Sequence, residues 1–111
     1  MQRDPSTILD IAAACRFISQ ATTGVSLELF LANPEKQYAI MHQLMVIGEA
    51  AKRLSPEFRA QHPQLPWTNI AGMRDKLIHD YDEIDPHQVW QAATRDVPDL
   101  LVYLEPLIPK P

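Results

Sequence analysis

The stretch NPEKQYAIMHQLMVIGEAAKRL, residues 33–54, decides the fold of this chain. Asn33 followed by Pro34 is a strong start signal for a helix, because the amide caps free N–H groups and proline suits the first turn. Apolar residues then recur at helical spacing and form a broad face, in which Gly48 and Ala50 permit a neighbour to approach closely. We therefore expect a long helix at the centre of a bundle.

Proline also marks the other helix starts, since the ten prolines fall mostly at the beginnings of segments. With only three glycines and no strand-like alternation, the sequence predicts one all-α domain over residues 1–111, with four to five up-and-down helices. Pro98 should kink the last helix at about Thr94. The expected helical segments are residues 5–21, 26–31, 33–54 and 67–79, with a short helical turn opened by Ser55 between the third and the fourth. A last helix is expected to start at Asp85 and Pro86. Asp4 should cap the first of these segments and Ser26 the second.

Charge and cysteine content narrow the class of protein. The net charge of −4 argues against a protein that coats nucleic acid, although a nuclease needs only a local basic cleft. Cys15 is the single cysteine, so no internal disulfide is expected. Without a leader or a long apolar run, we expect a soluble, cytoplasmic protein that does not enter a membrane. The candidate residues for a basic cleft are Arg16, Lys52, Arg53, Arg74 and Lys76.

The run MRDKLIHDY, residues 73–81, combines a fixed cation, a titratable imidazole and a phenol in Arg74, His79 and Tyr81. A guanidinium binds phosphate oxygens, and an imidazole exchanges protons near neutral pH. Such a group can act on a phosphodiester. RNA supplies its own nucleophile, the 2′-hydroxyl, so the chemistry requires no metal or cofactor.

The spacing does not place this group on one helical face. At about 100° per residue, Arg74 and His79 point roughly 140° apart. Either the helix ends near Asp80, which lets His79 and Tyr81 turn toward Arg74, or residues of two chains meet across a dimer cleft.

These residues resemble the HepT-like toxins of the HEPN superfamily of helical ribonucleases, whose motif is Arg, four to six residues, His, any residue, Tyr. The flanking segments WTNIAGMRD (67–75) and IGEAAK (47–52) also resemble the family, and the likeness runs from about Ile8 to Ile108. One departure is His42, which stands where the family commonly has an arginine seven residues before Glu49.

The resemblance implies a HEPN-type bundle that forms a homodimer and cuts RNA as a metal-independent endoribonuclease. The chain would be the toxin of a type VII-like HepT/MntA toxin–antitoxin system. Arg74 and His79 would be catalytic, and Asp75 or Glu49 would orient the arginine. Tyr81 would bind substrate and would accept AMP from a minimal nucleotidyltransferase antitoxin, and this modification would block RNA by charge and bulk.

Each residue also has a plain structural interpretation. Arg74 can form an ion pair with Asp75, Asp80 or Glu49. His79 can be a capping histidine at a helix C-terminus, and the Tyr81 ring can simply close the bundle end. At the level of function, the alternatives are a non-catalytic module that binds and modulates a nucleotidyltransferase, and a purely structural dimerisation domain.

A metal site is not expected. The four histidines, His42, His62, His79 and His87, lack the spacing of a metal-binding helix and fall on different segments. The acidic run between Asp80 and Asp85 resembles a solvated loop followed by a helix N-cap more than a cation site.

Overall fold

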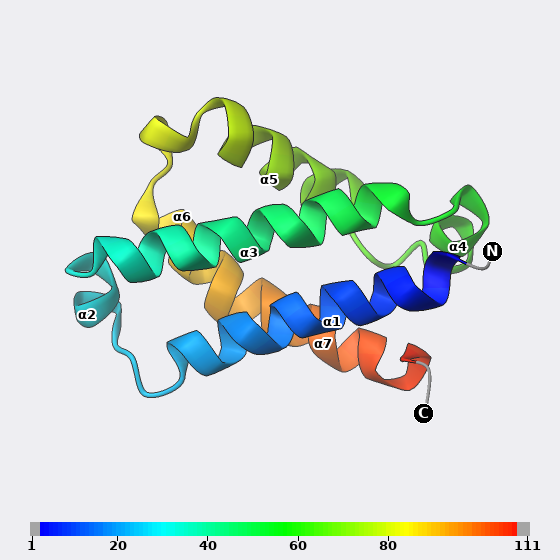
Figure 1. The fold of residues 1–111 in the computed structure, drawn as a ribbon, viewed down its shortest axis with the longest axis horizontal. Coiled ribbons are helices and arrows are strands. Elements are labelled where there is room, and N and C mark those ends of the chain that lie inside the picture. Colours follow the sequence, from blue (N-terminus) through cyan, green and yellow to red (C-terminus); the bar gives the residue numbers. More distant parts are fainter. Residues whose placement is uncertain (1–2, 109–111) are drawn as a thin grey trace.

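The computed structural model describes residues 3–108, apart from the side chain of Tyr81. Every regular element in this range is helical, which confirms the all-α prediction (Figure 1). Short 3-10 turns at Tyr81–Glu83 and Glu105–Leu107 and a π-helical segment at Ala92–Asp96 accompany the α-helices. The α-helices are α1 (Arg3–Thr22), α2 (Leu27–Leu31), α3 (Pro34–Arg53), α4 (Pro56–Gln61), α5 (Trp67–His79), α6 (Pro86–Gln91) and α7 (Val97–Leu104).

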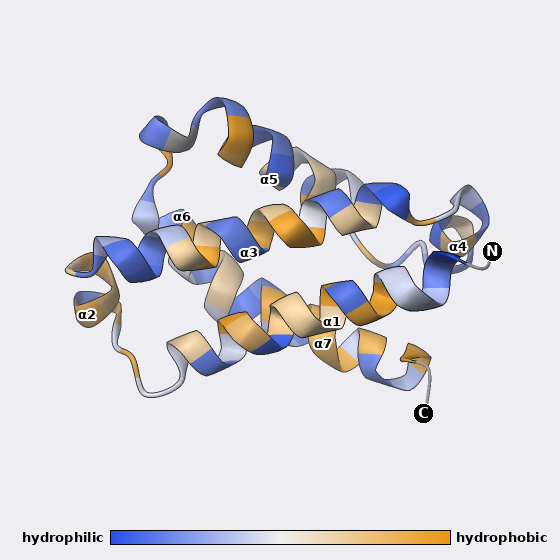
Figure 2. Cartoon of the chain, in the orientation of Figure 1, coloured by the Kyte–Doolittle hydropathy of each residue, from blue (hydrophilic) through white to orange (hydrophobic). Residues whose placement is uncertain are grey.

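Helix α3 lies at the centre of the bundle, as its sequence predicts. It packs against α1 on one side and α5 on the other, and α7 packs against α1 (Figure 1). Successive long helices run in opposite directions, so the up-and-down arrangement is confirmed. Figure 2 shows hydrophobic and hydrophilic residues alternating along α1 and α3, as expected for helices with one buried face. Ile18, Ile40 and Leu104 are completely buried in the core.

Side-chain caps fix where the helices begin. Ser26 accepts a hydrogen bond from the Leu29 N–H at 3.1 Å, and Asn33 accepts one from the Lys36 N–H at 3.0 Å. Asp85 caps α6 in the same way. These contacts satisfy N–H groups that have no partner within the helix. The predicted starts after Ser26, Asn33 and Asp85 are therefore confirmed.

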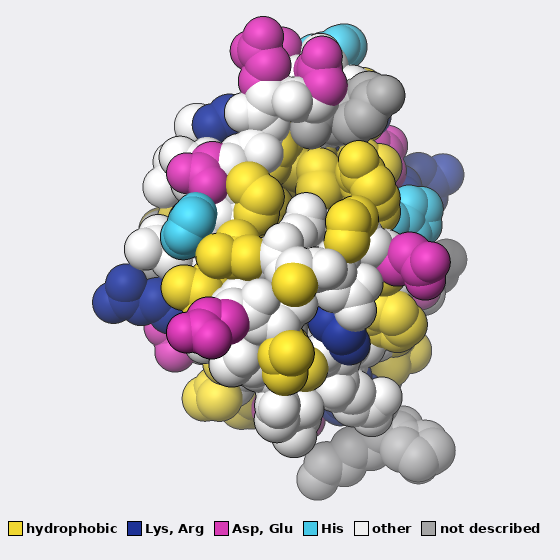
Figure 3. Space-filling view, turned by 90° about the vertical axis from the view of Figure 1, so that its left-hand side faces the viewer, with side chains coloured by type: hydrophobic (Ala, Val, Ile, Leu, Met, Phe, Trp, Pro, Cys, Tyr) yellow, Lys and Arg dark blue, Asp and Glu magenta, His cyan; other side chains and the backbone are white. Residues whose placement is uncertain are grey.

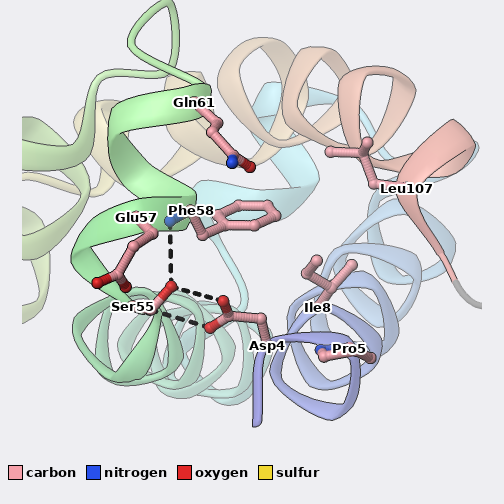
Figure 4. A pocket seen from close by; sticks show the side chains of 8 residues that line it. All are labelled: Asp4, Pro5, Ile8, Ser55, Glu57, Phe58, Gln61 and Leu107. Atoms are coloured by element: carbon pink, nitrogen blue, oxygen red, sulfur yellow. Dashed lines mark hydrogen bonds between the residues drawn. The ribbon is translucent and has the colours of Figure 1, made fainter. Parts of the chain in front are cut away.

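Asp4 is not the N-cap of α1, so this prediction is wrong. Asp4 lies inside the helix, which begins at Arg3, and its carboxylate reaches across to α4 (Figure 4). There it accepts hydrogen bonds from the Ser55 N–H at 2.9 Å and the Ser55 hydroxyl at 2.6 Å. Ser55 in turn caps α4 by accepting from the Phe58 N–H at 3.0 Å. Asp4 thus orients the cap of a different helix, a role that local sequence does not reveal.

The expected interruption of the last helix near Thr94 takes the form of the π-helical segment. Pro98 has no N–H to donate to a preceding carbonyl, and its ring would crowd the turn before it. The chain widens there instead, and the Val97 N–H donates to the Ala92 carbonyl. The Thr94 hydroxyl donates to the Trp90 carbonyl at 2.7 Å. The extra residue in this turn lets α6 and α7 continue as one path past Pro98.

Candidate active site on α5

Arg74 is positioned by the packing of α5 against α3. Its side chain leaves α5 directly over Gly48, where an added Cβ would collide with the Arg74 Cβ. The same Cβ would lie 3.1 Å from the Arg74 Cγ and 3.1 Å from the Ile70 carbonyl oxygen. Only glycine fits at this level of the two helices. The predicted close approach is therefore confirmed at Gly48. This contact fixes the position along α3 at which the Arg74 side chain crosses that helix.

Two carboxylates hold the Arg74 guanidinium. Its Nη2 lies 2.7 Å from the Glu49 Oε2 on α3, and its Nη1 lies 2.9 Å from the Asp75 Oδ1. Lys52 donates to the same Asp75 oxygen at 2.7 Å. The predicted ion pairs of Arg74 with Glu49 and Asp75 are confirmed, whereas Asp80 forms none with Arg74 in the described part of the chain.

This network keeps its members charged. The hydrogen bond from Lys52, followed by the one from Arg74, lowers the pKa of the Asp75 carboxyl. The hydrogen bond to Asp75 raises the pKa of Arg74 further above its already high value. The guanidinium keeps about a quarter of its side chain exposed, while its Nε is buried and has no hydrogen-bond partner among the described residues. Arg74 is therefore a fixed, partly accessible cation.

Only some of the basic residues expected to form a cleft gather near Arg74. Lys52 joins Arg74 at Asp75, and Lys76 donates to Gln88 on α6. The other two basic residues lie elsewhere, so that prediction is wrong for them. Arg16 pairs with Glu105 at 3.4 Å, and Arg53 pairs with Asp10 at 3.6 Å on α1.

His79 is the last residue of α5 and is exposed. The helix ends there as predicted, because Asp80 leaves helical geometry and donates its N–H to the Lys76 carbonyl at 2.8 Å. No described side chain forms a hydrogen bond or ion pair with the imidazole. In the described part of the chain, the partners of the Arg74 guanidinium are Glu49 and Asp75, and no hydrogen bond or ion pair joins it to His79.

Comparison with known proteins identifies the family. Residues 11–107 match the family described as "Ribonuclease HepT-like", which covers most of the chain. The chain belongs to the HepT-like ribonuclease family. The resemblance inferred from the motif is thereby confirmed, and no solved structure matches the chain.

Three relatives of this HepT-like chain are similar to it over most of its length. The "Probable ribonuclease HepT" of Thermococcus cleftensis is 40% identical over 91 residues, covering 82% of this chain and 83% of that protein. The "Putative RNase TTE0752" of Caldanaerobacter subterraneus subsp. tengcongensis is 37% identical over 100 residues, which cover 90% of this chain and 89% of that protein. The "Putative RNase MJ0125" of Methanocaldococcus jannaschii is 36% identical over 108 residues, which cover 96% of this chain and 93% of that protein.

Two motif positions of the HepT-like chain need separate comment. Tyr81 begins the 3-10 turn after α5, and its side chain lies outside the described residues. His42 is exposed on α3, two helical turns before Glu49, and therefore lies on the same face. An imidazole at this position is shorter than an arginine side chain, so it reaches less far from α3 beside Glu49 and Arg74.

Exposed apolar side chains adjoin the motif and the nearby end of the bundle. Ile78 lies one turn after Arg74 on α5 and is 40% exposed, and Tyr38 on α3 is 60% exposed. Leu29 and Leu31 on α2 are also exposed. Figure 3, which views the end of the bundle where α2 lies, shows hydrophobic side chains across that face with acidic side chains at its upper edge. The sequence analysis did not predict this surface.

A groove of about 490 Å³ lies between α5 and the segment from the π-helix to α7. Its apolar floor includes Leu44 and Ile47 of α3, and Asp96 and Asp99 belong to its lining. Four separate segments contribute, so no local motif predicts it. Its lining residues are Leu44, Ile47, Gln64, Leu65, Pro66, Asn69, Ile70, Met73, Ala92, Asp96, Val97, Asp99, Leu100 and Tyr103.

The described residues contain no group of three His, Cys, Asp or Glu side chains placed to hold a metal ion. The same part of the chain contains no helix with the length and apolar character that a membrane span requires.

Proposed function

We propose that this HepT-like chain is a metal-independent endoribonuclease that cleaves RNA by attack of the 2′-hydroxyl on the adjacent phosphate. The observation that carries the proposal is an Arg74 cation held by two carboxylates on the same helix that ends at the exposed His79. The names of the relatives support RNA as the substrate. The 2′-hydroxyl is the nucleophile, so the reaction needs only charge stabilisation and proton transfer.

In this mechanism, Arg74 binds the scissile phosphate and stabilises the charge that builds on its oxygens. Glu49 and Asp75 hold the guanidinium in one orientation before RNA arrives. His79 takes the 2′-hydroxyl proton or protonates the leaving 5′-oxygen, a contribution of roughly 10²–10⁴ in rate. The products are a 2′,3′-cyclic phosphate and a 5′-hydroxyl.

Two copies of the chain would form the complete site. Ideal helical geometry points Arg74 and His79 roughly 140° apart on one helix, and no hydrogen bond or ion pair joins them within the described chain. We propose that Arg74 of one protomer acts with His79 of its partner in a homodimer. The exposed apolar Ile78, on the Arg74 face of α5, supports a protein contact beside the motif.

The same site would be regulated by modification. As the toxin of a type VII-like toxin–antitoxin system, the chain would be silenced by a minimal nucleotidyltransferase that transfers AMP to Tyr81. Tyr81 lies two residues beyond His79 in the turn after α5. A nucleotide there would add negative charge and bulk beside the catalytic imidazole and would exclude RNA.

One observation favours a second candidate function. The Arg74 guanidinium is already bound by two carboxylates, and the chain is acidic overall. Both features weaken phosphate binding, as expected if the Arg74, His79 and Tyr81 group docks a nucleotidyltransferase without cutting RNA.

The experiment that tests the proposal is cleavage of total cellular RNA by purified protein in excess EDTA. The protein is first confirmed by mass to carry no AMP on Tyr81. Wild type should cut RNA and leave cyclic phosphate at the 3′ ends, whereas His79→Ala should not. His87→Ala is the matched control, because His87 is an exposed histidine on α6 whose ring pairs with Asp85. Absence of cleavage by unmodified wild type, or loss of partner binding in His79→Ala, would favour the docking function.

A further inference from the structure

Lys52 and Arg74 bind the same carboxylate oxygen from two different helices. The Lys52 Nζ lies 2.7 Å from the Asp75 Oδ1, and the Arg74 Nη1 lies 2.9 Å from that same atom. Lys52 belongs to α3 and Arg74 to α5, so the packing of these two helices brings the charges together. Two cations therefore surround one anionic oxygen beside the candidate active site.

Without Lys52, Arg74 would make a poor phosphate site. Glu49 and Asp75 both bind its guanidinium, so this group carries one positive and two negative charges. Its excess negative charge would repel an incoming phosphate. Lys52 supplies a second positive charge at the same place. With Lys52 included, the cluster is neutral and no longer opposes an anion.

Both cations keep hydrogen-bond donors for a ligand. A lysine ammonium has three N–H donors and an arginine guanidinium has five. In the described chain, Asp75 takes one donor from Lys52, and Glu49 and Asp75 bind separate nitrogens of Arg74. The Lys52 side chain is 38% exposed and the Arg74 side chain is 24% exposed, so a ligand in solution can reach both.

We propose that Lys52 binds the same RNA phosphate as Arg74 of its own protomer. Two oxygens of one phosphate would then contact the two cations that now share the Asp75 oxygen. Lys52 would act as a compact positive charge, while the planar guanidinium of Arg74 fixes the orientation of the phosphate. This inference rests on the proposed ribonuclease function, because it adds a substrate-binding residue to that site.

Arg53 provides a matched control for Lys52. It is the next residue on α3, carries the same charge and is similarly exposed, but it pairs at 3.6 Å with Asp10 of α1. Both ion pairs are exposed and contribute little to folding. Neutral variants at either position should therefore remain folded, and a comparison of the two separates the position of a charge from its mere loss.

The first measurement is the affinity for an RNA oligonucleotide with 2′-fluoro sugars, followed by fluorescence anisotropy. This RNA cannot be cut, because it lacks the nucleophilic hydroxyl. Lys52→Gln should bind it roughly tenfold or more weakly than wild type, as expected for a lost hydrogen bond to a charged group. Arg53→Gln should stay within about twofold of wild type, and Lys52→Arg should keep most of the affinity. Equal affinities of Lys52→Gln and Arg53→Gln would overturn the proposal.

A second measurement separates direct contact with RNA from an effect through Asp75. Asp75→Asn removes the negative charge that holds Lys52. If Lys52 contacts the phosphate, Lys52→Gln should still weaken binding several-fold in the Asp75→Asn protein. If Lys52→Gln has no effect in that background, Lys52 only positions Asp75 and the proposal is wrong.

Cleavage of ordinary RNA in excess EDTA keeps this inference distinct from the proposed function. At saturating RNA, Lys52→Gln should cut several-fold more slowly than Arg53→Gln, because negative charge builds on the phosphate in the transition state. Equal rates of these two variants, with an active wild type, would refute the inference alone. Lys52-dependent binding by a wild type that cuts nothing would refute the ribonuclease and sustain the phosphate site. Wild type that binds no RNA would overturn both.

Discussion

At the scale of single residues, the contact between Gly48 and Arg74 links helix packing to the candidate chemistry. Glycine is required at position 48 because an added Cβ would occupy the space of the Arg74 side chain. The Arg74 side chain then emerges between α3 and α5 at the point where Glu49 and Asp75 can bind its guanidinium. A helix glycine normally destabilises its helix, and here the close crossing offsets that cost.

Gly48→Ala should therefore push α5 away from α3 and misplace Arg74. We expect a loss of about 1–3 kcal/mol in the free energy of unfolding, typical of overpacking, together with slower RNA cleavage. Urea unfolding and cleavage assays measure the two effects. Gly72→Ala is the control, since nothing lies within 4 Å of its added Cβ. This control should gain about 0.5–1 kcal/mol from helix propensity; equal behaviour of the two variants would contradict the packing argument.

Asp4 should make stability depend on pH. Burial alone would raise the pKa of this carboxyl, but the hydrogen bonds from Ser55 hold it below the usual 3.8. A lowered pKa in the folded state means that the stabilisation is complete above the pKa of the unfolded chain. It is then lost as pH falls through the folded pKa.

Asp4→Asn should therefore lower the free energy of unfolding by roughly 1–3 kcal/mol at neutral pH. The difference from wild type should shrink in acid, where both side chains are uncharged. Urea titrations at several pH values give this comparison, with exposed Asp82→Asn as the control. A difference that stays constant down to the acid limit would show that the charge of Asp4 is unimportant.

At the scale of secondary-structure elements, short α2 depends on one buried ring. Phe30 is completely buried and packs against Trp90 of α6, with ring centroids 5.0 Å apart and the ring planes tilted by 42°. A helix of this length does not form alone in water, so its packing must hold it in place. The contact also ties the link between α1 and α3 to the second half of the chain.

Phe30→Ala should cost about 3–5 kcal/mol of unfolding free energy, the usual range for a buried aromatic residue. Removing the ring should also expose Trp90 to water and shift its fluorescence to longer wavelength. Leu29→Ala is the neighbouring control, because Leu29 is 61% exposed and should change stability by less than about 0.5 kcal/mol. Similar losses in both variants would mean that α2 is not anchored through Phe30.

At the scale of the whole molecule, the placement of Arg74 and His79 on one helix bears most directly on the proposed activity. One helix carries both residues, and its geometry turns them away from each other. The proposed site shared by two protomers would resolve this conflict and would make activity a property of the assembly.

Mixing two inactive variants tests this directly. In a heterodimer of Arg74→Ala with His79→Ala, one of the two composite sites keeps both wild-type residues. After exchange of subunits, the mixture should regain about a quarter of wild-type cleavage, because half of the dimers are mixed and each has one complete site. Each variant alone should remain inactive. No recovery in a mixture shown to contain heterodimers would place Arg74 and His79 of one chain in the same site.

The sequence by itself determined the helical class, most helix starts and the family. Proline, serine and asparagine act through neighbouring backbone groups, and apolar periodicity acts along one helix, so these signals can be read locally. For the same reason the motif of Arg74, His79 and Tyr81 was visible before the fold.

Only the tertiary structure decided what depends on contacts between distant segments. The sequence placed Asp4 at its own helix start, whereas the fold brings it to Ser55. It left three possible carboxylate partners for Arg74, and the packing of α3 on α5 selected Glu49 and Asp75. The π-helical turn before Pro98 and the groove beside α5 also arise where separate segments pack. Such features depend on the distance between packed helices. Residues such as Gly48 determine that distance, but only after both helices have formed and met.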